Sequence, residues 1–346
     1  MLEAGERNMV TVPVCLNRQT SRINRSLKFY DVYNGDADGL CALLQLRLNE
    51  PRDTVLVSGV KRDNALLERV DAQRGDEITV LDVSLDVNRD ALERALQNGA
   101  RVSWFDHHHP GKIPVSPAFV SHIDTDPATC TSLIVDRYLG GKFRLWAIVA
   151  AFGDNLEQPA RHLAGAVGLA APQTELLRDL GICLNYNAYG ETVDDLLYSP
   201  IELFRNMSSF TDPREFVHST DILAALQVQI HEDLTRAQAV RVKPIAPGSA
   251  FAVLPDTGWS RRVLGVYANE LARREPHTAH AIMVERAGGY KVSIRAPIAE
   301  PRGASDVARA FDSGGGRLGA AGIDFLPSAE LDRLFVVMRD TFPGDR

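Results

Sequence analysis

Runs of apolar, often β-branched residues alternate with amphipathic stretches through the first part of the chain. This pattern predicts strands at 28–33, 54–58, 78–82 and 101–105, and helices at 39–48, 64–70 and 88–98. Strands that alternate with helices in this way are typical of βαβ units. We therefore expect an α/β fold whose first unit is a mostly parallel, doubly wound sheet covered by helices on both faces.

The pattern changes after the first unit. Residues 191–238 keep helical spacing without strand signals, and we expect one long connecting helix over 216–241. A Pro- and Gly-containing break at 243–248 precedes a smaller α/β unit, with strands at 250–254, 280–285 and 290–296 and helices at 265–273 and 305–311. The predicted organisation is a flexible arm (1–26), a first unit (27–200), a helical linker (201–242) and a second unit (243–346).

Composition and charge narrow the class of protein. The 346 residues carry a formal charge of −7, which disfavours a long basic groove for extended nucleic acid. No apolar run is long enough to span a bilayer, and the amino terminus lacks a clean signal peptide, so we expect a cytoplasmic protein without a membrane partner. None of the four cysteines belongs to a CxxC pair, which argues against a zinc ribbon and a disulfide framework.

Two carboxylates stand close together directly after the first predicted strand. Asp36 and Asp38 belong to the segment Asp36-Ala37-Asp38-Gly39, at the turn from strand to helix. Carboxylates this close repel each other unless a cation lies beside them. The alternative is that one of them only caps the following helix.

Further ligand-type side chains follow other apolar runs. Asp82 ends the strand at 78–82, Asp106-His107-His108 closes the strand at 101–105, and Asp154 follows the apolar stretch 145–152. Ligand sites of open α/β sheets lie at the carboxyl ends of their strands. Mixed carboxylate and imidazole donors suit Mn²⁺ or Mg²⁺ better than structural zinc, and two such ions can promote an in-line displacement.

A glycine-rich segment, Gly314-Gly315-Gly316-Arg317, lies far from these residues in the sequence. Its backbone amides could approach an anion closely, and a guanidinium pairs well with phosphate. The alternative is that the glycines only permit a tight backbone geometry.

Taken together and in order, these segments resemble the DHH phosphoesterase family, in its subgroup with an attached DHHA1 domain. The similarity extends over residues 28–342, and Ser293-Ile294-Arg295 resembles a further motif of that second domain. The matching segments are Asp36-Ala37-Asp38-Gly39, Asp82, Asp106-His107-His108, Asp154, Ser293-Ile294-Arg295 and Gly314-Gly315-Gly316-Arg317.

The resemblance implies hydrolysis of phosphodiester or phosphoanhydride bonds with two Mn²⁺ ions, Mg²⁺ being the other candidate. Asp36 and Asp82 would hold one ion, and Asp38, Asp82, His107 and Asp154 the other. His108, with Asp106 beside it, would act catalytically at the scissile phosphate. Arg295 and the segment from Gly314 through Gly315 and Gly316 to Arg317 would bind the substrate.

Two positions depart from the family pattern. Val32 stands where many members have a metal-binding His, and Arg317 stands where the family has His. The expected substrate is a short oligonucleotide or a phosphorylated nucleotide, and a homodimer is compatible with the sequence. Hydrolysis of polyphosphate or pyrophosphate, and nucleotide binding with weakened catalysis, are the alternative functions.

Overall fold

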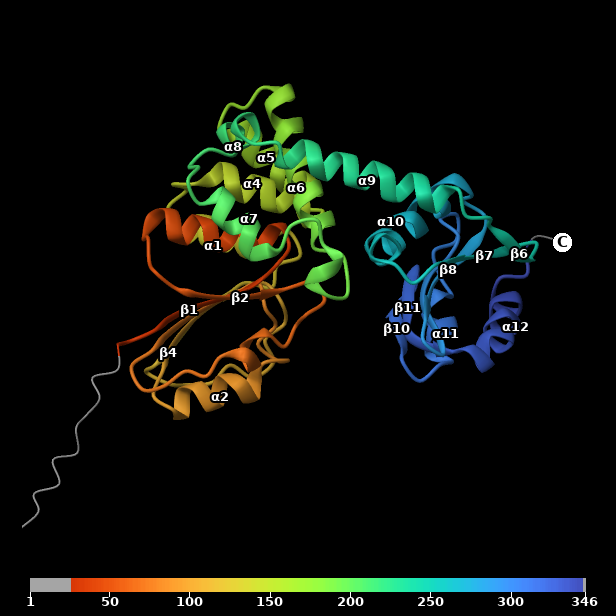
Figure 1. Cartoon of the computed structure of the whole chain (residues 1–346), viewed down its shortest axis with the longest axis horizontal. Coiled ribbons are helices and arrows are strands. Elements are labelled where there is room, and N and C mark those ends of the chain that lie inside the picture. Colours follow the sequence, from red (N-terminus) through yellow and green to blue (C-terminus); the bar gives the residue numbers. More distant parts are fainter. Residues whose placement is uncertain (1–25, 345–346) are drawn as a thin grey trace, which may run out of the picture.

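The computed structural model describes residues 26–344, and Figure 1 shows two units bridged by a long helix. The arm expected at residues 1–26 lies, apart from Ser26, outside the described residues. None of the helices in the described range has the length and hydropathy that a crossing of a bilayer requires.

The first unit is built on a five-stranded, entirely parallel sheet with the strand order β2-β1-β3-β4-β5. This confirms the expected fold class. The strands are β1 (Phe29–Asn34), β2 (Val55–Gly59), β3 (Glu77–Leu81), β4 (Arg101–Asp106) and β5 (Phe119–Ile123). Their apolar runs lack alternation because a parallel sheet of this kind is buried on both faces.

Helices cover both faces of this sheet, and each face has its own apolar core. Figure 1 shows α1, α4 and α7 on one side and α2 on the other. The helical elements are α1 (Ala37–Asn49), η1 (Leu66–Arg69), α2 (Arg89–Gln97), α3 (Thr131–Tyr138), α4 (Arg144–Gly153), α5 (Glu157–Ala166), α6 (Ala171–Asn187), η2 (Val193–Asp195), α7 (Pro200–Met207), α8 (Pro213–Ser219) and α9 (Ile222–Gln238).

Two helix predictions in this part of the chain are wrong. The helix expected at 64–70 is only the single 3₁₀ turn η1, because Val70 takes an extended conformation. The single helix expected at 216–241 is instead divided into α8 and α9, because Thr220 between them is extended with φ −135° and ψ 155°.

The residues assigned to a linker, 201–242, differ in where they pack. Leu203 of α7 and Phe216 of α8 are fully buried in the core of the first unit. Within α9, Leu226 belongs to that same core, whereas Ala237 belongs to a core of the second unit. Of the residues assigned to the linker, those of α9 therefore pack on both units.

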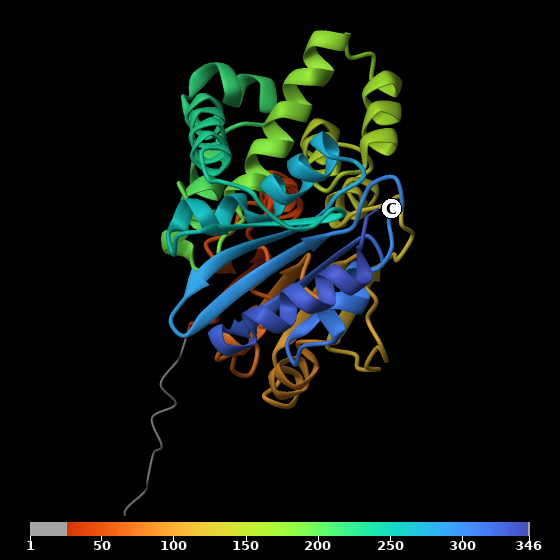
Figure 2. The ribbon, with the colours of Figure 1, turned by 90° about the vertical axis from the view of Figure 1, so that its right-hand side faces the viewer.

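The second unit contains a six-stranded mixed sheet with the order β10-β11-β9-β8-β7-β6, in which only β7 and β8 are parallel. Figure 2 shows α12 lying across this sheet. The elements are β6 (Lys243–Ala246), β7 (Ser249–Leu254), α10 (Gly258–Arg274), β8 (Ala279–Arg286), β9 (Gly289–Arg295), α11 (Ala304–Arg309), β10 (Gly314–Arg317), β11 (Ala320–Pro327), η3 (Ser328–Glu330) and α12 (Leu331–Thr341).

The glycine-rich segment forms the edge strand β10, which pairs with β11 in a hairpin. A Cβ atom on Gly314 would lie 1.7 Å from the carbonyl oxygen of Ala308, and Gly316 has φ +142°. Gly314 is therefore required by close backbone packing against α11 and Gly316 by the backbone conformation of the hairpin, whereas a Cβ atom on Gly315 would meet no atom within 4 Å.

Candidate metal centre

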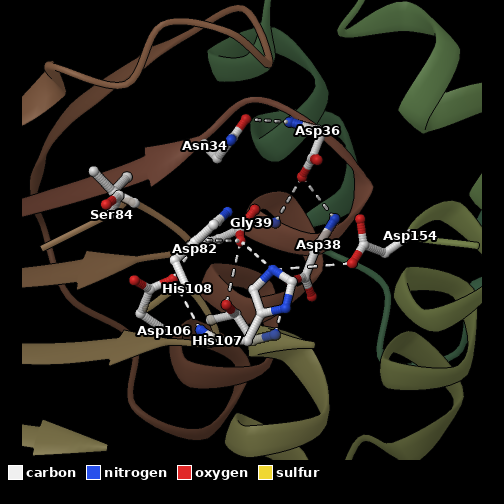
Figure 3. Close-up of polar contacts among 12 residues, drawn as sticks. Asn34, Asp36, Asp38, Gly39, Asp82, Ser84, Asp106, His107, His108 and Asp154 are labelled. Carbon is white, nitrogen blue, oxygen red and sulfur yellow. Dashed lines mark hydrogen bonds and ion pairs between the residues drawn. The ribbon is translucent and has the colours of Figure 1, made fainter. Parts of the chain in front are cut away.

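Three aspartates meet at the carboxyl edge of the parallel sheet, where Figure 3 shows them beside one another. Asp36 follows β1, Asp82 follows β3 and Asp106 ends β4, and these three strands are neighbours in the sheet. Each of the three residues is at most 2% exposed. Several carboxylates are thus held together out of water, and burial of this kind is unfavourable without cations or hydrogen-bond donors.

Asp36 caps helix α1, as the alternative interpretation proposed. Its Oδ1 atom accepts hydrogen bonds from the backbone N–H groups of Asp38 at 3.0 Å and Gly39 at 3.1 Å. Its other oxygen, Oδ2, lies 2.6 Å from the ammonium nitrogen of Lys61. Burial alone would raise the pKa of Asp36, but Lys61 and these hydrogen bonds hold it below its usual value.

The carboxylate of Asp38 is oriented by a helix that the sequence did not predict. Its two oxygens accept hydrogen bonds from the backbone N–H groups of Thr131 and Ser132, each at 2.7 Å, at the start of α3. A helix amino terminus favours negative charge. Asp38 is therefore held at a defined position in the site.

Asp82 has an unusual backbone and an unusual charge environment. Its φ of +57° is rare for a residue other than glycine, although Asp and Asn tolerate it best. Burial, followed by repulsion from Asp36 and Asp38, raises the pKa of Asp82 well above its usual value. A cation beside Asp82 would relieve this repulsion.

The Asp-His-His segment forms one connected group. His108 Nδ1 lies 2.7 Å from Asp106 Oδ1, which also accepts a hydrogen bond from the backbone N–H of His107 at 2.9 Å. The hydrogen bond to Asp106 raises the pKa of His108. The other oxygen of Asp106 is buried and has no hydrogen-bond partner among the described residues.

Asp154 reaches the same place from the end of α4. A Cβ atom on Gly153 would lie 2.5 Å from the Cβ of Ala37 and 2.8 Å from the carbonyl oxygen of Gly181, so only glycine permits this close packing of α4 against α1 and α6. Burial and the nearby Asp38 raise the pKa of Asp154 to about 6.

These side chains form two overlapping groups that could hold a metal ion. In one, Asp82, His107 and His108 each have a donor atom within 4.8 Å of the others; in the second, Asp38, His107 and Asp154 do. The mixture of carboxylate oxygens and imidazole nitrogens fits Mn²⁺. Mg²⁺ would bind mainly to the carboxylate oxygens, because it prefers oxygen ligands. The crowded carboxylates at Asp82 independently indicate that a cation fits here.

A cleft of about 470 Å³ connects this cluster to the second unit. Of the predicted substrate-binding residues, Arg295 lines the cleft, whereas residues 314–317 are not among its lining. Arg317 lies two strands from Arg295, across Ala320, and is exposed.

The cations in the cleft differ in their partners. Arg261 of α10 pairs with Asp195 of the first unit. Arg262 of α10 pairs with Asp233 of α9. Arg295 instead bonds to neutral groups, Asn269 Oδ1 at 2.5 Å and Ser293 Oγ at 3.0 Å.

Burial, followed by repulsion from Arg62, lowers the pKa of Arg295. Two guanidinium groups therefore face the cleft close enough to repel each other, and the described residues provide no acidic partner for Arg295. An anion between them would be stabilised.

Several functional residues were not identified from the sequence: Lys61, Arg62 and Asn269 line the cleft, and Asn185 accepts a hydrogen bond from Lys61. Lys61 and Arg62 follow β2 at the same edge of the sheet as the aspartates. The rule that ligand sites lie at the carboxyl ends of strands could have found them. Asn185 and Asn269 lie within helices, and no sequence signal distinguishes them.

No family model and no curated protein sequence matches the chain. Similar solved structures include a manganese-bound RecJ exonuclease (TM-score 0.58, 18% identity, 91% of this chain and 90% of that chain). RecJ of Thermus thermophilus with Mn²⁺ has a TM-score of 0.58 and 19% identity, over 92% of this chain but only 52% of that chain. The pGpG-specific phosphodiesterase PggH of Vibrio cholerae has a TM-score of 0.51 and 13% identity, over 91% and 99%.

These similarities confirm the fold that the motifs implied. The chain shares the two-domain fold of the RecJ structures, with the aspartates and His107 of its own sequence gathered at the edge of the first sheet.

Proposed function

We propose that the protein is a metal-dependent phosphoesterase that hydrolyses phosphodiester bonds of short oligonucleotides or small nucleotides, with Mn²⁺ as the preferred ion. The observation that supports this most is the composition of the cleft. Carboxylates, imidazoles and Arg62 line the cleft from the first unit, and Arg295 lines it from the second unit. The cleft therefore offers a place for a metal ion and a place for phosphate.

The proposed metal ligands are Asp38, Asp82, His107 and Asp154. An ion bound there would polarise the phosphoryl group and make water a better nucleophile. His107 favours Mn²⁺ over Mg²⁺, because imidazole is a better ligand for the former. The backbone N–H groups of Thr131 and Ser132 keep Asp38 in place before any ion binds.

His108 is the proposed proton donor to the departing oxygen. Its Nδ1 is engaged by Asp106, which leaves Nε2 as the ring nitrogen available to substrate. Because the hydrogen bond to Asp106 raises the pKa of His108, a larger share of this imidazole is protonated at neutral pH. Arg295 would bind a phosphate and hold the substrate against the metal centre.

We propose direct attack by water without a covalent intermediate. Among the described residues that line the cleft there is no serine, threonine or cysteine to act as nucleophile. Hydrolysis in ¹⁸O-labelled water under single-turnover conditions should place the label in the first phosphate product. A first-turnover product without the label contradicts direct attack.

The volume of the cleft favours a small substrate, since pockets of a few hundred cubic ångströms suit ligands of nucleotide or dinucleotide size. The names of the similar structures, an exonuclease and a pGpG-specific phosphodiesterase, support the same class.

The test is an activity screen with Mn²⁺ on short oligoribonucleotides, a linear dinucleotide, phosphoadenosine phosphate and polyphosphate. We expect hydrolysis of the oligoribonucleotides or of the linear dinucleotide, both of which contain phosphodiester bonds, and much less by the variant Asp82→Asn. Hydrolysis of only phosphoadenosine phosphate, which carries phosphomonoesters, of polyphosphate alone, or of none of the four contradicts the proposal.

A further inference from the structure

Lys61 lies inside the cluster of acidic residues rather than on the surface beside it. Its ammonium nitrogen is 2.6 Å from Asp36 Oδ2, 2.9 Å from Asn185 Oδ1 and 3.4 Å from Asp154 Oδ1. An ammonium group has three N–H donors, and each has an oxygen partner here. The three oxygens come from positions as far apart as residues 36, 154 and 185.

The surroundings of Lys61 hold its side chain in this place. The backbone N–H of Lys61 donates to the carbonyl oxygen of Ala188 at 3.0 Å, and its own carbonyl oxygen accepts from Asn34 Nδ2 at 3.3 Å. Asn185 is 5% exposed, and its Nδ2 donates to the hydroxyl of Tyr189 at 2.9 Å, which leaves its carbonyl oxygen for Lys61. The backbone and the acceptor are therefore both fixed.

With Lys61 in place, both carboxylate oxygens of Asp36 accept hydrogen bonds from the protein. Oδ1 accepts from the backbone N–H groups of Asp38 and Gly39, and Oδ2 from Lys61. Asp36 belongs to neither of the two groups of described residues whose donor atoms lie close enough to share a metal ion. A divalent ion at Asp36 would have to displace Lys61 or stand beside its positive charge.

We propose that this centre combines one metal ion with the ammonium group of Lys61, which takes the place of a second cation between Asp36 and Asp154. The inference rests on the proposed function, because it divides the same acidic cluster into a part that binds a metal ion and a part neutralised by the protein. The ion would be held by Asp38, Asp82 and His107 with the remaining oxygen of Asp154. Lys61 is a positioning residue, since all three of its donors are used within the protein.

The experiment is a Mn²⁺ titration of the full chain by equilibrium dialysis with elemental analysis, combined with electron paramagnetic resonance. We expect one bound ion per chain, with the six-line spectrum of an isolated Mn²⁺. In Lys61→Ala the oxygens of Asp36 and Asp154 become available, and we expect a second bound ion with spin coupling to the first. Lys61→Gln, whose neutral polar side chain is only one heavy atom shorter than that of lysine, provides the same measurement if the alanine variant does not fold.

Two controls separate the position of Lys61 from its charge. Arg62→Ala removes one positive charge from the same cleft and should still bind one ion, because Lys61, not Arg62, forms the ion pair with Asp36 among the described residues. Lys61→Arg keeps the charge and should also bind one ion. Two ions in the unmodified protein, or one ion in both folded neutral variants, would overturn the inference. No bound ion in the unmodified protein would instead refute the proposed function.

Discussion

The two walls of the cleft hold their charged side chains in different ways. At the edge of the parallel sheet, Asp36, Asp38 and Asp82 are at most 2% exposed, and backbone N–H groups orient the first two. On the second unit, Arg295 is only partly buried and is held by an amide and a hydroxyl. The first wall is fixed for a small cation, whereas the second leaves a guanidinium available to a larger anion.

A buried ion pair and a hydrogen bond connect the elements that carry the two walls. Asp233 of α9 pairs with Arg262 of α10 at 2.8 Å and accepts a hydrogen bond from the hydroxyl of Tyr186 at 2.7 Å. Asp233 is fully buried, so breaking this pair would leave an uncompensated charge. The site thus combines one wall whose carboxylates are fixed by backbone hydrogen bonds, here called the rigid wall, with an adaptable wall that carries Arg295.

The largest expected effect comes from the rigid wall. Asp82→Asn keeps the shape of the side chain and tolerates φ +57°, but it removes the negative charge. We expect Mn²⁺ affinity to fall and kcat/KM to decrease by about 10²-fold or more. Asp136→Asn, at a buried aspartate that pairs with Arg144 away from the cluster, is the matched control. Near-normal activity of a folded Asp82→Asn protein would contradict the assignment.

A substitution in the adaptable wall should change KM and leave Mn²⁺ binding unchanged. Arg295→Ala removes a substrate contact and no metal ligand, so KM should rise by about tenfold or more while Mn²⁺ binding stays unchanged. Steady-state kinetics and a metal titration on the same preparation measure both. Arg302→Ala, at an exposed arginine that pairs with Glu300, should change neither. Loss of Mn²⁺ from Arg295→Ala would show that the two walls are not independent.

The thermal stability of the protein should depend on pH through the acidic residues of the rigid wall. Asp154 has its pKa raised to about 6, so the metal-free folded protein becomes less stable as pH rises from about 4 to 6, and this loss is complete above pH 6. A bound cation offsets it. Saturating Mn²⁺, worth about 2.7 kcal/mol at 100 times Kd, should raise Tm by several degrees at pH 7.5 and by less at pH 5.5. An equal shift at both pH values would contradict this coupling.

The smallest effect is expected at the glycine-rich strand. Arg317 is exposed on β10 and does not line the cleft, so Arg317→Ala should change KM by only about two- to threefold, as exposed charges usually do. Comparison with Arg295→Ala is the measurement. An effect as large as that of Arg295→Ala would show that β10 approaches the metal centre when substrate binds.

The α/β class of the first unit and the positions of most ligand-type residues could be predicted from the local sequence pattern. Strands β1, β3 and β4 begin and end within one or two residues of the prediction. Short, nearly continuous apolar runs are typical of parallel strands that are buried on both faces. Once the strands are parallel, residues that follow them must share one edge. Asp36, Asp82 and Asp106 therefore came together as predicted from local pattern alone.

The hydrogen-bond partners of these residues, in contrast, depend on the packing of the whole chain. Lys61 contacts Asp154 and Asn185, which are 93 and 124 residues away, and Thr131 reaches Asp38 over 93 residues. The same holds for the glycine-rich segment, whose pairing with β11 and packing against α11 made it a strand. Hydrogen-bond partners depend on distances set by the packing of whole helices, and a local pattern of apolar and polar residues contains no information about those distances.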